Sequence, residues 1–220
     1  MTCKTLTNIR TYWALICLTV AAVTADAQSA MKNIFISAPR DVIATIDSIT
    51  RVEMVLYNEA GSATASKNLF GGPCRINFIT DEEIKVKTSP ASEIALYRLP
   101  AAKGDSVILA ISTVSLPATD SQAQMYSSDW QPLPTKMQLP NVNDIDLWLT
   151  PEGKTRRQEV ENAVPFIPAF FIYAPATSTL IVDSSVRQLI GKENYEPISS
   201  CLKKVINYRW DGRKWTLITK

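Results

Sequence analysis

An alternation of apolar and polar residues, which begins near Arg75, constrains the fold more than any other feature of this chain. The alternating apolar residues of its clearest part are Ile84, Val86, Ile94 and Leu96. A period of two is typical of β-strands that bury one face. The sequence therefore predicts consecutive antiparallel strands whose apolar side chains share a face.

The side chains also predict how the strand that contains Ile84 and Val86 pairs with the strand that contains Ile94 and Leu96. If Ser89–Ala91 forms a three-residue loop, Val86 faces Ile94, and Lys87 faces Glu93 on the opposite face. This register joins apolar side chains on one face and opposite charges on the other. A slip of one residue would bury lysines, so the pairing is strongly specified.

Further strands are expected on both sides of this hairpin. Ile76 and Phe78 share the inward face with Ile84 and Val86 if the Asp81-Glu82-Glu83 loop is odd in length. The segment 105–114 is an almost continuous apolar run, which is typical of a central strand. The segment 122–127 then adds one more strand.

Two helices are predicted before the sheet. Helical spacing of apolar residues, with proline in the first turn, predicts a helix from Ser37 to about Ser48. Thr50-Arg51-Val52-Glu53 matches a capping box and predicts a second helix, whose apolar stripe is Val52, Val55 and Leu56. Gly61 is placed to end it.

The C-terminal part is predicted to mix helices and hairpins. Its expected elements are a short helix near 156–163, a hairpin of 169–173 with 178–183, a helical stretch interrupted at Gly191, and a final hairpin turning at Asp211-Gly212. A two-residue turn there pairs Tyr208 with Trp215. The resulting aromatic face suits either a hydrophobic core or a platform that stacks on sugars.

Four prolines between Gln131 and Pro151 predict a partly extended connector. The chain therefore divides into a signal peptide (1–27), a helix-pair and β-meander half (28–130), the connector (131–155) and a mixed half (156–220), expected to form one compact domain. The predicted fold class is α+β, an antiparallel β-meander and hairpin sheet with helix pairs packed on one face.

The N-terminus has the layout of a secretory signal. Lys4 and Arg10 precede an apolar run over 12–23, and Ala25-Asp26-Ala27 is a small-x-small cleavage site. The run is shorter than the ~20 residues that a membrane-spanning helix needs, so cleavage after Ala27 is favoured over an uncleaved anchor. The mature protein is expected in the periplasm or outside the cell, with no stable membrane span.

Composition excludes several chemistries. The chain contains no histidine, which rules out Ser-His-Asp and Cys-His nucleophile systems and the usual zinc-protease motif. A net charge of +2 gives no reason to expect a nucleic-acid partner, and no cofactor or metal site is predicted. Cys74 and Cys201 remain after cleavage, either as one disulfide or as two buried thiols.

Candidate catalytic motifs are weak. Ser200-Cys201-Leu202-Lys203 matches the S-x-x-K pattern of penicillin-recognising enzymes, but their K-T-G motif is absent. Carboxylates that could serve a glycoside hydrolase are Asp81, Glu82, Glu83, Asp129, Asp144 and Asp146. Sequence alone places no two of them at the required separation.

The order of several short segments resembles an uncharacterised family of exported proteins from Gram-negative gut anaerobes, known only as a domain of unknown function. The segments are Phe35-Ile36-Ser37-Ala38-Pro39, Gly71-Gly72, Ile79-Thr80-Asp81-Glu82-Glu83-Ile84, Leu99-Pro100, Tyr126-Ser127-Ser128-Asp129-Trp130-Gln131-Pro132-Leu133 and Tyr208-Arg209-Trp210-Asp211-Gly212. Ala38-Pro39-Arg40-Asp41 departs from the Met-Pro-Asp-Ser that the family would have there. The resemblance implies a fold and no site residues.

These observations favour a non-enzymatic envelope protein that binds a protein or glycan partner. Its predicted binding patch is on and beside the connector: Trp130, Trp148, Asp144 and Asp146. The alternatives are a carboxylate-based glycan hydrolase and an inhibitor of a secreted enzyme. A hydrolase needs a concave site with two converging carboxylates, a binder needs an exposed apolar or aromatic patch, and an inhibitor needs a loop that projects from a rigid sheet.

Overall fold

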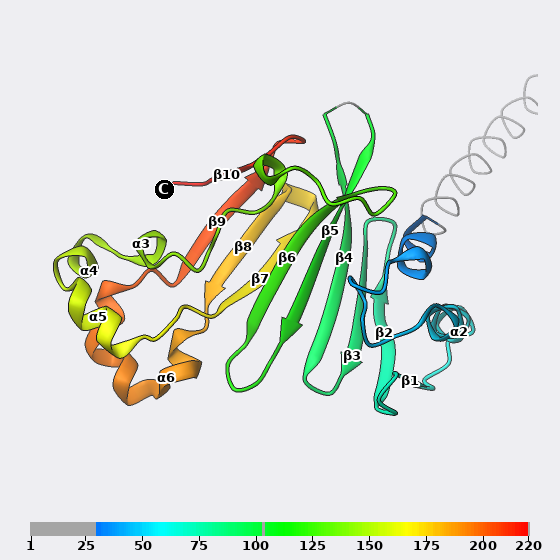
Figure 1. The fold of residues 1–220 in the computed structure, drawn as a ribbon, viewed down its shortest axis with the longest axis horizontal. Helices are drawn as coiled ribbons and strands as arrows, with labels where there is room; N and C mark the ends of the chain where they lie inside the picture. Colours follow the sequence, from blue (N-terminus) through cyan, green and yellow to red (C-terminus); the bar gives the residue numbers. More distant parts are fainter. Residues whose placement is uncertain (1–29, 103, 220) are drawn as a thin grey trace, which may run out of the picture.

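The computed structural model describes residues 30–102 and 104–219 and contains two antiparallel sheets (Figure 1). The first has the order β1-β2-β3-β4-β5-β6, with bounds Ser66–Lys67, Pro73–Ile79, Glu83–Ser89, Ser92–Pro100, Ser106–Val114 and Asp120–Ser127. The second has the order β10-β9-β8-β7, with bounds Trp215–Leu217, Val205–Trp210, Thr179–Ser184 and Ala169–Ala174. The helices are α2 (Ser48–Glu59), α3 (Ile145–Trp148), α4 (Pro151–Thr155), α5 (Arg157–Ala163) and α6 (Val186–Tyr195), with a helical segment over 30–37. The predicted α+β class is confirmed.

The meander has the predicted central register. Val86 pairs with Ile94 and Lys87 with Glu93, while β5 lies between β4 and β6 as its apolar run predicts. The loop is shorter than expected, because Ser89 pairs with Ser92 after an irregularity at Thr88. This irregularity takes up the extra residue, so the pairs closer to the strand centres are unchanged.

The predicted inward position of Phe78 is wrong. The β2–β3 register shifts between Ile76 and Phe78, so Phe78 pairs with Lys85 and its side chain is 44% exposed. A bulge places two residues of one strand opposite one residue of its partner and re-aims the side chains that follow. The ammonium of Lys85 lies 5.8 Å from the centre of the Phe78 ring.

Both faces of β4 and β5 are buried, where the sequence predicted a sheet with a single apolar face. On one face Ile94 and Leu96 pack with the segment 30–46 and with α2. On the other face Tyr97 and Leu109 pack with the second sheet and with the chain around α3 to α5. A helix pair thus covers one face of the first sheet, and the C-terminal half covers the other.

The first predicted helix, Ser37 to Ser48, is wrong. The helical segment ends at residue 37, and residues 38–47 form turns and bends. Pro39 disfavours helical geometry at the residue before it. The buried guanidinium of Arg51 donates hydrogen bonds to the carbonyl oxygens of Phe35 and Ala38, at the end of the helical segment, where carbonyls lack intrahelical donors.

Helix α2 begins earlier than the capping box predicted. The carboxylate of Asp47 accepts a hydrogen bond of 2.7 Å from the backbone N–H of Thr50, which makes Asp47 the N-cap. The predicted stop at Gly61 is confirmed. Gly61 has a φ of +63°, and the N–H groups of Gly61 and Ser62 donate to the carbonyls of Asn58 and Tyr57, as in a Schellman motif.

The register of the final hairpin differs from the prediction by two residues. Trp210 pairs with Trp215, and Tyr208 with Leu217. The Asp211 carboxylate accepts hydrogen bonds from the N–H groups of Arg213 and Lys214, which widens the turn to four residues. A shift of two residues leaves each side chain on its predicted face.

The aromatic face of this hairpin is part of the core. Trp210 and Trp215 are buried, with ring centroids 5.3 Å apart. The ring of Tyr173 on β7 lies 6.0 Å from that of Trp215 and 5.1 Å from that of Tyr97 on β4. The core interpretation is confirmed, although the rings pack on strands of both sheets and not on a helix.

The proline-rich connector is held against the sheet by hydrogen bonds. The side-chain amide of Gln138 accepts from the N–H of Met125 on β6 and donates to the carbonyls of Met125 and Leu133. The connector also contains a 3₁₀ turn over Thr135–Met137 and the helices α3 and α4. Helix α6 is interrupted at Gly191 as predicted, with a φ of +80°. Over 30–102 and 104–219, no helix has the length and hydrophobicity to cross a bilayer.

Candidate functional site

The two tryptophans of the predicted patch lie in separate hydrophobic clusters. Trp148 is fully buried in the core shared by the two sheets, and its indole N–H donates 2.7 Å to the carbonyl of Val142. Trp130 is 7% exposed and packs on the other side of the first sheet, where its indole N–H donates to the hydroxyl of Ser37. The structure therefore does not bring the two rings together, and neither presents a face to a partner.

Both aspartates of that patch have structural contacts. The carboxylate of Asp144 caps α3 by accepting from the N–H of Asp146. The carboxylate of Asp146 forms an ion pair with Arg157 of α5. A surface ion pair of this kind contributes little to stability. A binding role for Asp144 and Asp146 stays a prediction.

A shallow groove of about 420 Å³ lies beside the connector and includes Asp144. Its lining contains a second carboxylate, Glu161, and the half-exposed ring of Phe166. Glu161 is already paired with the guanidinium of Arg157 at 2.7 Å. The Glu161 carboxylate therefore already serves an ion pair along α5.

The S-x-x-K segment lacks the geometry of a serine nucleophile with a lysine base. The ammonium of Lys203 donates to the carbonyl of Leu147, while the hydroxyl of Ser200 donates to the carboxylate of Glu152. Hydrogen bonds from Ser200 and Arg156 lower the pKa of Glu152. Ser200 and Lys203 therefore each fasten this part of the C-terminal half to the connector.

The two cysteines are free and buried, which resolves the alternatives left open by the sequence. Cys74 lies in the cluster under α2 and Cys201 in the core between the sheets. Burial raises the pKa of the Cys74 thiol, so this thiol is not activated as a nucleophile. Among the described residues, no group of three or more potential metal ligands is clustered.

An exposed apolar surface lies on α2 and the neighbouring loop, and sequence reasoning missed it. Its members, called the α2 apolar surface below, are Ile49 (81% exposed), Val52, Leu56, Leu69 and Phe70 (83% exposed). The N–H of Leu69 donates to the carbonyl of Thr45, which places the loop next to the segment leading into α2. Surfaces of this kind mark interaction sites when they are contiguous.

Of the predicted apolar stripe, Val55 is buried, whereas Val52 and Leu56 are exposed. The buried side of α2 instead carries Arg51, Met54 and Val55, because the guanidinium of Arg51 is held at the carbonyls of the preceding segment. Ile49, Val52 and Leu56 have the i, i+3, i+7 spacing of one helix face, and this is the sequence signal that could have identified the surface. Which face turns inward is decided by a tertiary contact.

Comparison with known proteins supports the fold and assigns no activity. No curated protein matches the sequence. A solved structure titled "Structure of a domain of an uncharacterized protein from Porphyromonas gingivalis W83" is similar with a TM-score of 0.70 and 21% identity, over 87% of this chain and 98% of that one. The model of the family described as "Protein of unknown function (DUF3256)" matches residues 22–215. Because this match includes nearly the whole chain, the protein belongs to that family.

Proposed function

We propose that this protein is an exported, non-enzymatic binding protein of the cell envelope that docks a protein partner on the α2 apolar surface. The observation that carries the proposal is the exposure of Ile49, Leu56 and Phe70 on one end of the first sheet. Leaving large apolar side chains in water costs roughly 25 cal/mol per Å² of apolar area, which a partner recovers on binding. A binder needs such a surface, and a hydrolase does not.

A protein partner fits this surface better than a lipid surface does. Asp47 caps α2 and Glu53 lies on its second turn, and the hydrogen bond from Thr50 lowers the pKa of Asp47, which keeps its carboxylate charged. Anionic headgroups attract basic segments and repel carboxylates. An apolar patch with an acidic rim instead complements a partner with an apolar centre and basic margins.

A second candidate is the inhibitor, and one loop favours it. Phe70 is at the tip of the β1–β2 loop, and Asn68 holds this loop rigidly. The side-chain oxygen of Asn68 accepts from the N–H groups of Phe70 and Gly72, and its amide donates to the carbonyl of Thr88. A projecting, preorganised loop of this kind is how a rigid scaffold presents an anchor residue.

Variants of the α2 apolar surface test the docking proposal. Crosslinking in the envelope fraction should join the wild-type protein to one defined partner. The double variant Ile49→Ser, Leu56→Ser should not form this crosslinked product. Exposed Leu116 (71%) lies outside the surface, so Leu116→Ser is the matched control and should crosslink normally. Thermal midpoints should stay unchanged, because surface substitutions usually alter stability by no more than about 0.5 kcal/mol.

Two outcomes separate the candidates. Loss of the partner with Phe70→Ser alone, together with inhibition of an envelope hydrolase by the wild-type protein, would favour the inhibitor. The proposal is overturned if the double variant of Ile49 and Leu56 crosslinks normally and Phe166→Ser loses the crosslinked partner. That result would place the docking surface at the connector groove.

Export is tested at the N-terminus, which lies outside the described residues. We expect the protein in the envelope or secreted fraction to begin at Gln28, because signal peptidase cuts after the small residue of a small-x-small site. Intact-mass measurement checks this directly. Ala27→Leu should slow processing and leave the longer chain, whereas Thr24→Ser, outside the small-x-small site, should be processed normally. A cytosolic chain that still begins at Met1 or Thr2 would contradict export.

A further inference from the structure

A groove of about 300 Å³ lies where the C-terminal half stops covering the first sheet. One wall is a row of side chains across β3, β4 and β5, in which Lys87 pairs with Glu93 and Glu93 with Thr113. Side chains alternate along a strand, so this row shares a face with Tyr97 and Leu109, which pack against the second sheet. The row is therefore the margin of the covered face.

The second sheet and α6 form the opposite wall. Phe170 of β7 pairs with Asp183 of β8, so both side chains lie on one face of that sheet. Ser185, which precedes α6, belongs to the same wall. The N–H of Thr119 donates to the side-chain oxygen of Gln188 on α6 at 3.0 Å. Because Thr119 and Gln188 both line the groove, this bond joins the two walls at one end.

Strand β7 is fastened to the first sheet beside the groove. The N–H of Ala169 donates to the carboxylate of Asp120 at 3.0 Å, and the N–H of Phe171 donates to the hydroxyl of Ser121 at 3.3 Å. The hydroxyl of Ser121 also lies 2.9 Å from that of Thr113, within hydrogen-bond distance. These bonds fix the two walls relative to each other, so the groove is preformed, as small-molecule sites usually are.

A buried hydroxyl of this groove has no partner in the described protein. Ser185 is 5% exposed, and although it precedes the first residue of α6, its hydroxyl makes no capping hydrogen bond. The N–H of Val186 donates to the hydroxyl of Ser184 at 3.4 Å instead. Buried polar groups are nearly always hydrogen-bonded, so an unpaired hydroxyl in the wall of a groove indicates a ligand.

Three charged side chains line the groove, and none forms an ion pair with another described residue. They are Lys87 and Glu93, which are half-buried, and Asp183, which is exposed. The carboxylate of Glu93 accepts a hydrogen bond of 3.4 Å from the side-chain amide of Asn77. Charges that are partly removed from water and left unpaired are unfavourable, so a ligand with complementary charges is favoured here.

A small zwitterion complements these charges. Lys87 and Glu93 are directly opposite each other on neighbouring strands, where Cβ atoms lie about 5 Å apart. An α-amino acid carries its ammonium and its carboxylate on one carbon, so it can contact both side chains at once. Asp183 adds a second carboxylate from the facing wall. The volume is at the lower end of the range of about 300–1,000 Å³ that ligand sites occupy, which suits a ligand of this size.

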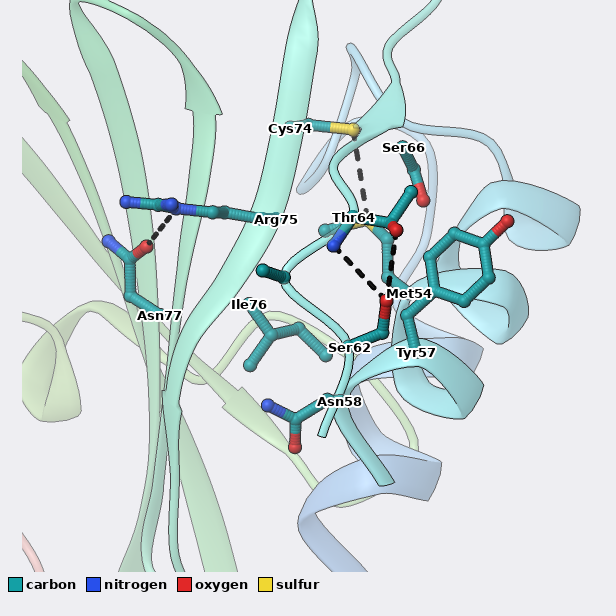
Figure 2. Close-up of a pocket in the computed structure, with 11 residues that line it drawn as sticks. Met54, Tyr57, Asn58, Ser62, Thr64, Ser66, Cys74, Arg75, Ile76 and Asn77 are labelled. Carbon is teal, nitrogen blue, oxygen red and sulfur yellow. Dashed lines mark hydrogen bonds between the residues drawn. The ribbon is translucent and has the colours of Figure 1, made fainter. Parts of the chain in front are cut away.

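A second hollow, of about 390 Å³, lies between α2 and β2 and lacks this combination (Figure 2). It contains Ser66, which is 4% exposed and whose Oγ has no hydrogen-bond partner among the described residues. Arg75 is the charged residue of its lining, but Figure 2 shows the Arg75 side chain directed away from Tyr57 and Ser62. The guanidinium and the Ser66 hydroxyl therefore do not face a common space.

We propose that the groove beside Lys87 binds a free α-amino acid with an apolar side chain. The carboxylate of the ligand lies at Lys87, and its ammonium lies at the carboxylates of Glu93 and Asp183. The hydroxyl of Ser185 accepts a hydrogen bond from this ammonium, and the half-buried ring of Phe170 contacts the apolar side chain. The site is independent of the α2 apolar surface, because α2 packs on the other face of the first sheet.

Calorimetric titration of the full-length protein tests the proposal with three probes that share one side chain. Leucine should bind saturably. N-acetylleucine, which lacks the ammonium, and leucinamide, which lacks the carboxylate, should each bind at least about tenfold more weakly, since a hydrogen bond to a charged group contributes roughly a factor of ten or more. No binding of leucine overturns the proposal. Leucinamide binding as tight as that of leucine also overturns it, and would assign the groove to the amino end of a peptide.

Variants assign each charge of the ligand to its side chain. Lys87→Gln should bind leucine and leucinamide equally and still reject N-acetylleucine, whereas Asp183→Asn should reduce the discrimination against N-acetylleucine. Lys85→Gln is the matched control, because Lys85 lies on the same face of β3 outside the lining of the groove. Wild-type affinity and selectivity in both Lys87→Gln and Asp183→Asn would overturn the site.

A further pair of variants separates ligand binding from folding and from docking. Ser185→Ala should weaken leucine binding about fivefold without lowering the thermal midpoint, because it removes a hydroxyl that has no partner in the described protein. Leucine affinity equal to wild type in Ser185→Ala would contradict the place of the ammonium. The double variant of Ile49 and Leu56 should bind leucine normally, so failure of the docking proposal and failure of this one are distinguishable.

Discussion

Replacing Gly153 by alanine should destabilise the protein by about 3 kcal/mol or more, because the new methyl group meets backbone atoms that cannot move. A Cβ at this position would lie 2.1 Å from the carbonyl oxygen of Cys201 and 2.9 Å from its carbonyl carbon. Contact distances under 3.0 Å are not tolerated by real Cβ atoms. Glycine is thus required here by close approach of two segments and not by its backbone angles.

The carbonyl that Gly153 approaches is fixed from several sides. The N–H of Thr150 donates to it at 2.9 Å, and Leu149 forms an isolated bridge with Leu202. The N–H of Lys203 then donates to the carbonyl of Trp148 at 2.8 Å. A shift that relieved the clash would break these bonds, each worth roughly 1 kcal/mol.

Chemical denaturation followed by circular dichroism measures the effect of Gly153→Ala. The matched control is Lys154→Ala, which changes the next residue of α4 and leaves an exposed position exposed. This control should unfold within about 0.5 kcal/mol of wild type. A Gly153→Ala protein with wild-type stability would mean that α4 and the segment before Lys203 are not locked together.

Replacing Trp148 by alanine should lower the free energy of unfolding by about 3–5 kcal/mol, as is usual when a buried tryptophan is truncated to alanine. Trp148 is fully buried among residues of both sheets, and its truncation also leaves the carbonyl of Val142 without its donor. Trp148→Phe keeps most of the apolar volume and loses the N–H, so its cost should be smaller. Both variants are measured by equilibrium unfolding, with tryptophan-independent detection.

The comparison variant for this prediction is Asp146→Ala, on the same short helix. It removes an exposed ion pair with Arg157 and should destabilise the protein far less than Trp148→Ala does. If Trp148→Ala remained as stable as wild type yet lost a partner, Trp148 would act as the binding residue that the sequence suggested. A large loss of stability identifies it as a core residue.

The β-meander could be predicted well because the evidence for it is local and repeated. The pairing of Val86 with Ile94 follows from a period of two combined with opposite charges at Lys87 and Glu93, and a slip of one residue would bury a charge. The bulge that exposes Phe78 has no such signature, since one extra residue in a strand leaves the composition unchanged.

The candidate sites were harder to predict, because exposure depends on what packs against each residue. Trp130 and Trp148 were assigned to a surface from their position beside prolines, and tertiary packing buries both. The α2 apolar surface and the Ser66 hydroxyl carry no motif. The spacing of Ile49, Val52 and Leu56 marks one face of α2, and only the packing of the segments 38–47, 62–66 and 73–79 around α2 shows which groups are exposed and which are buried.

By itself the sequence determined the α+β class, the strand order of the meander and the absence of histidine chemistry, because periodicity and composition act through neighbouring residues. The tertiary structure decided which face of α2 is buried, which carbonyl Gly153 must approach and where a hydroxyl is left without a partner. These depend on contacts between residues far apart in the chain, and the free energy of such contacts is set by the packing of both partners.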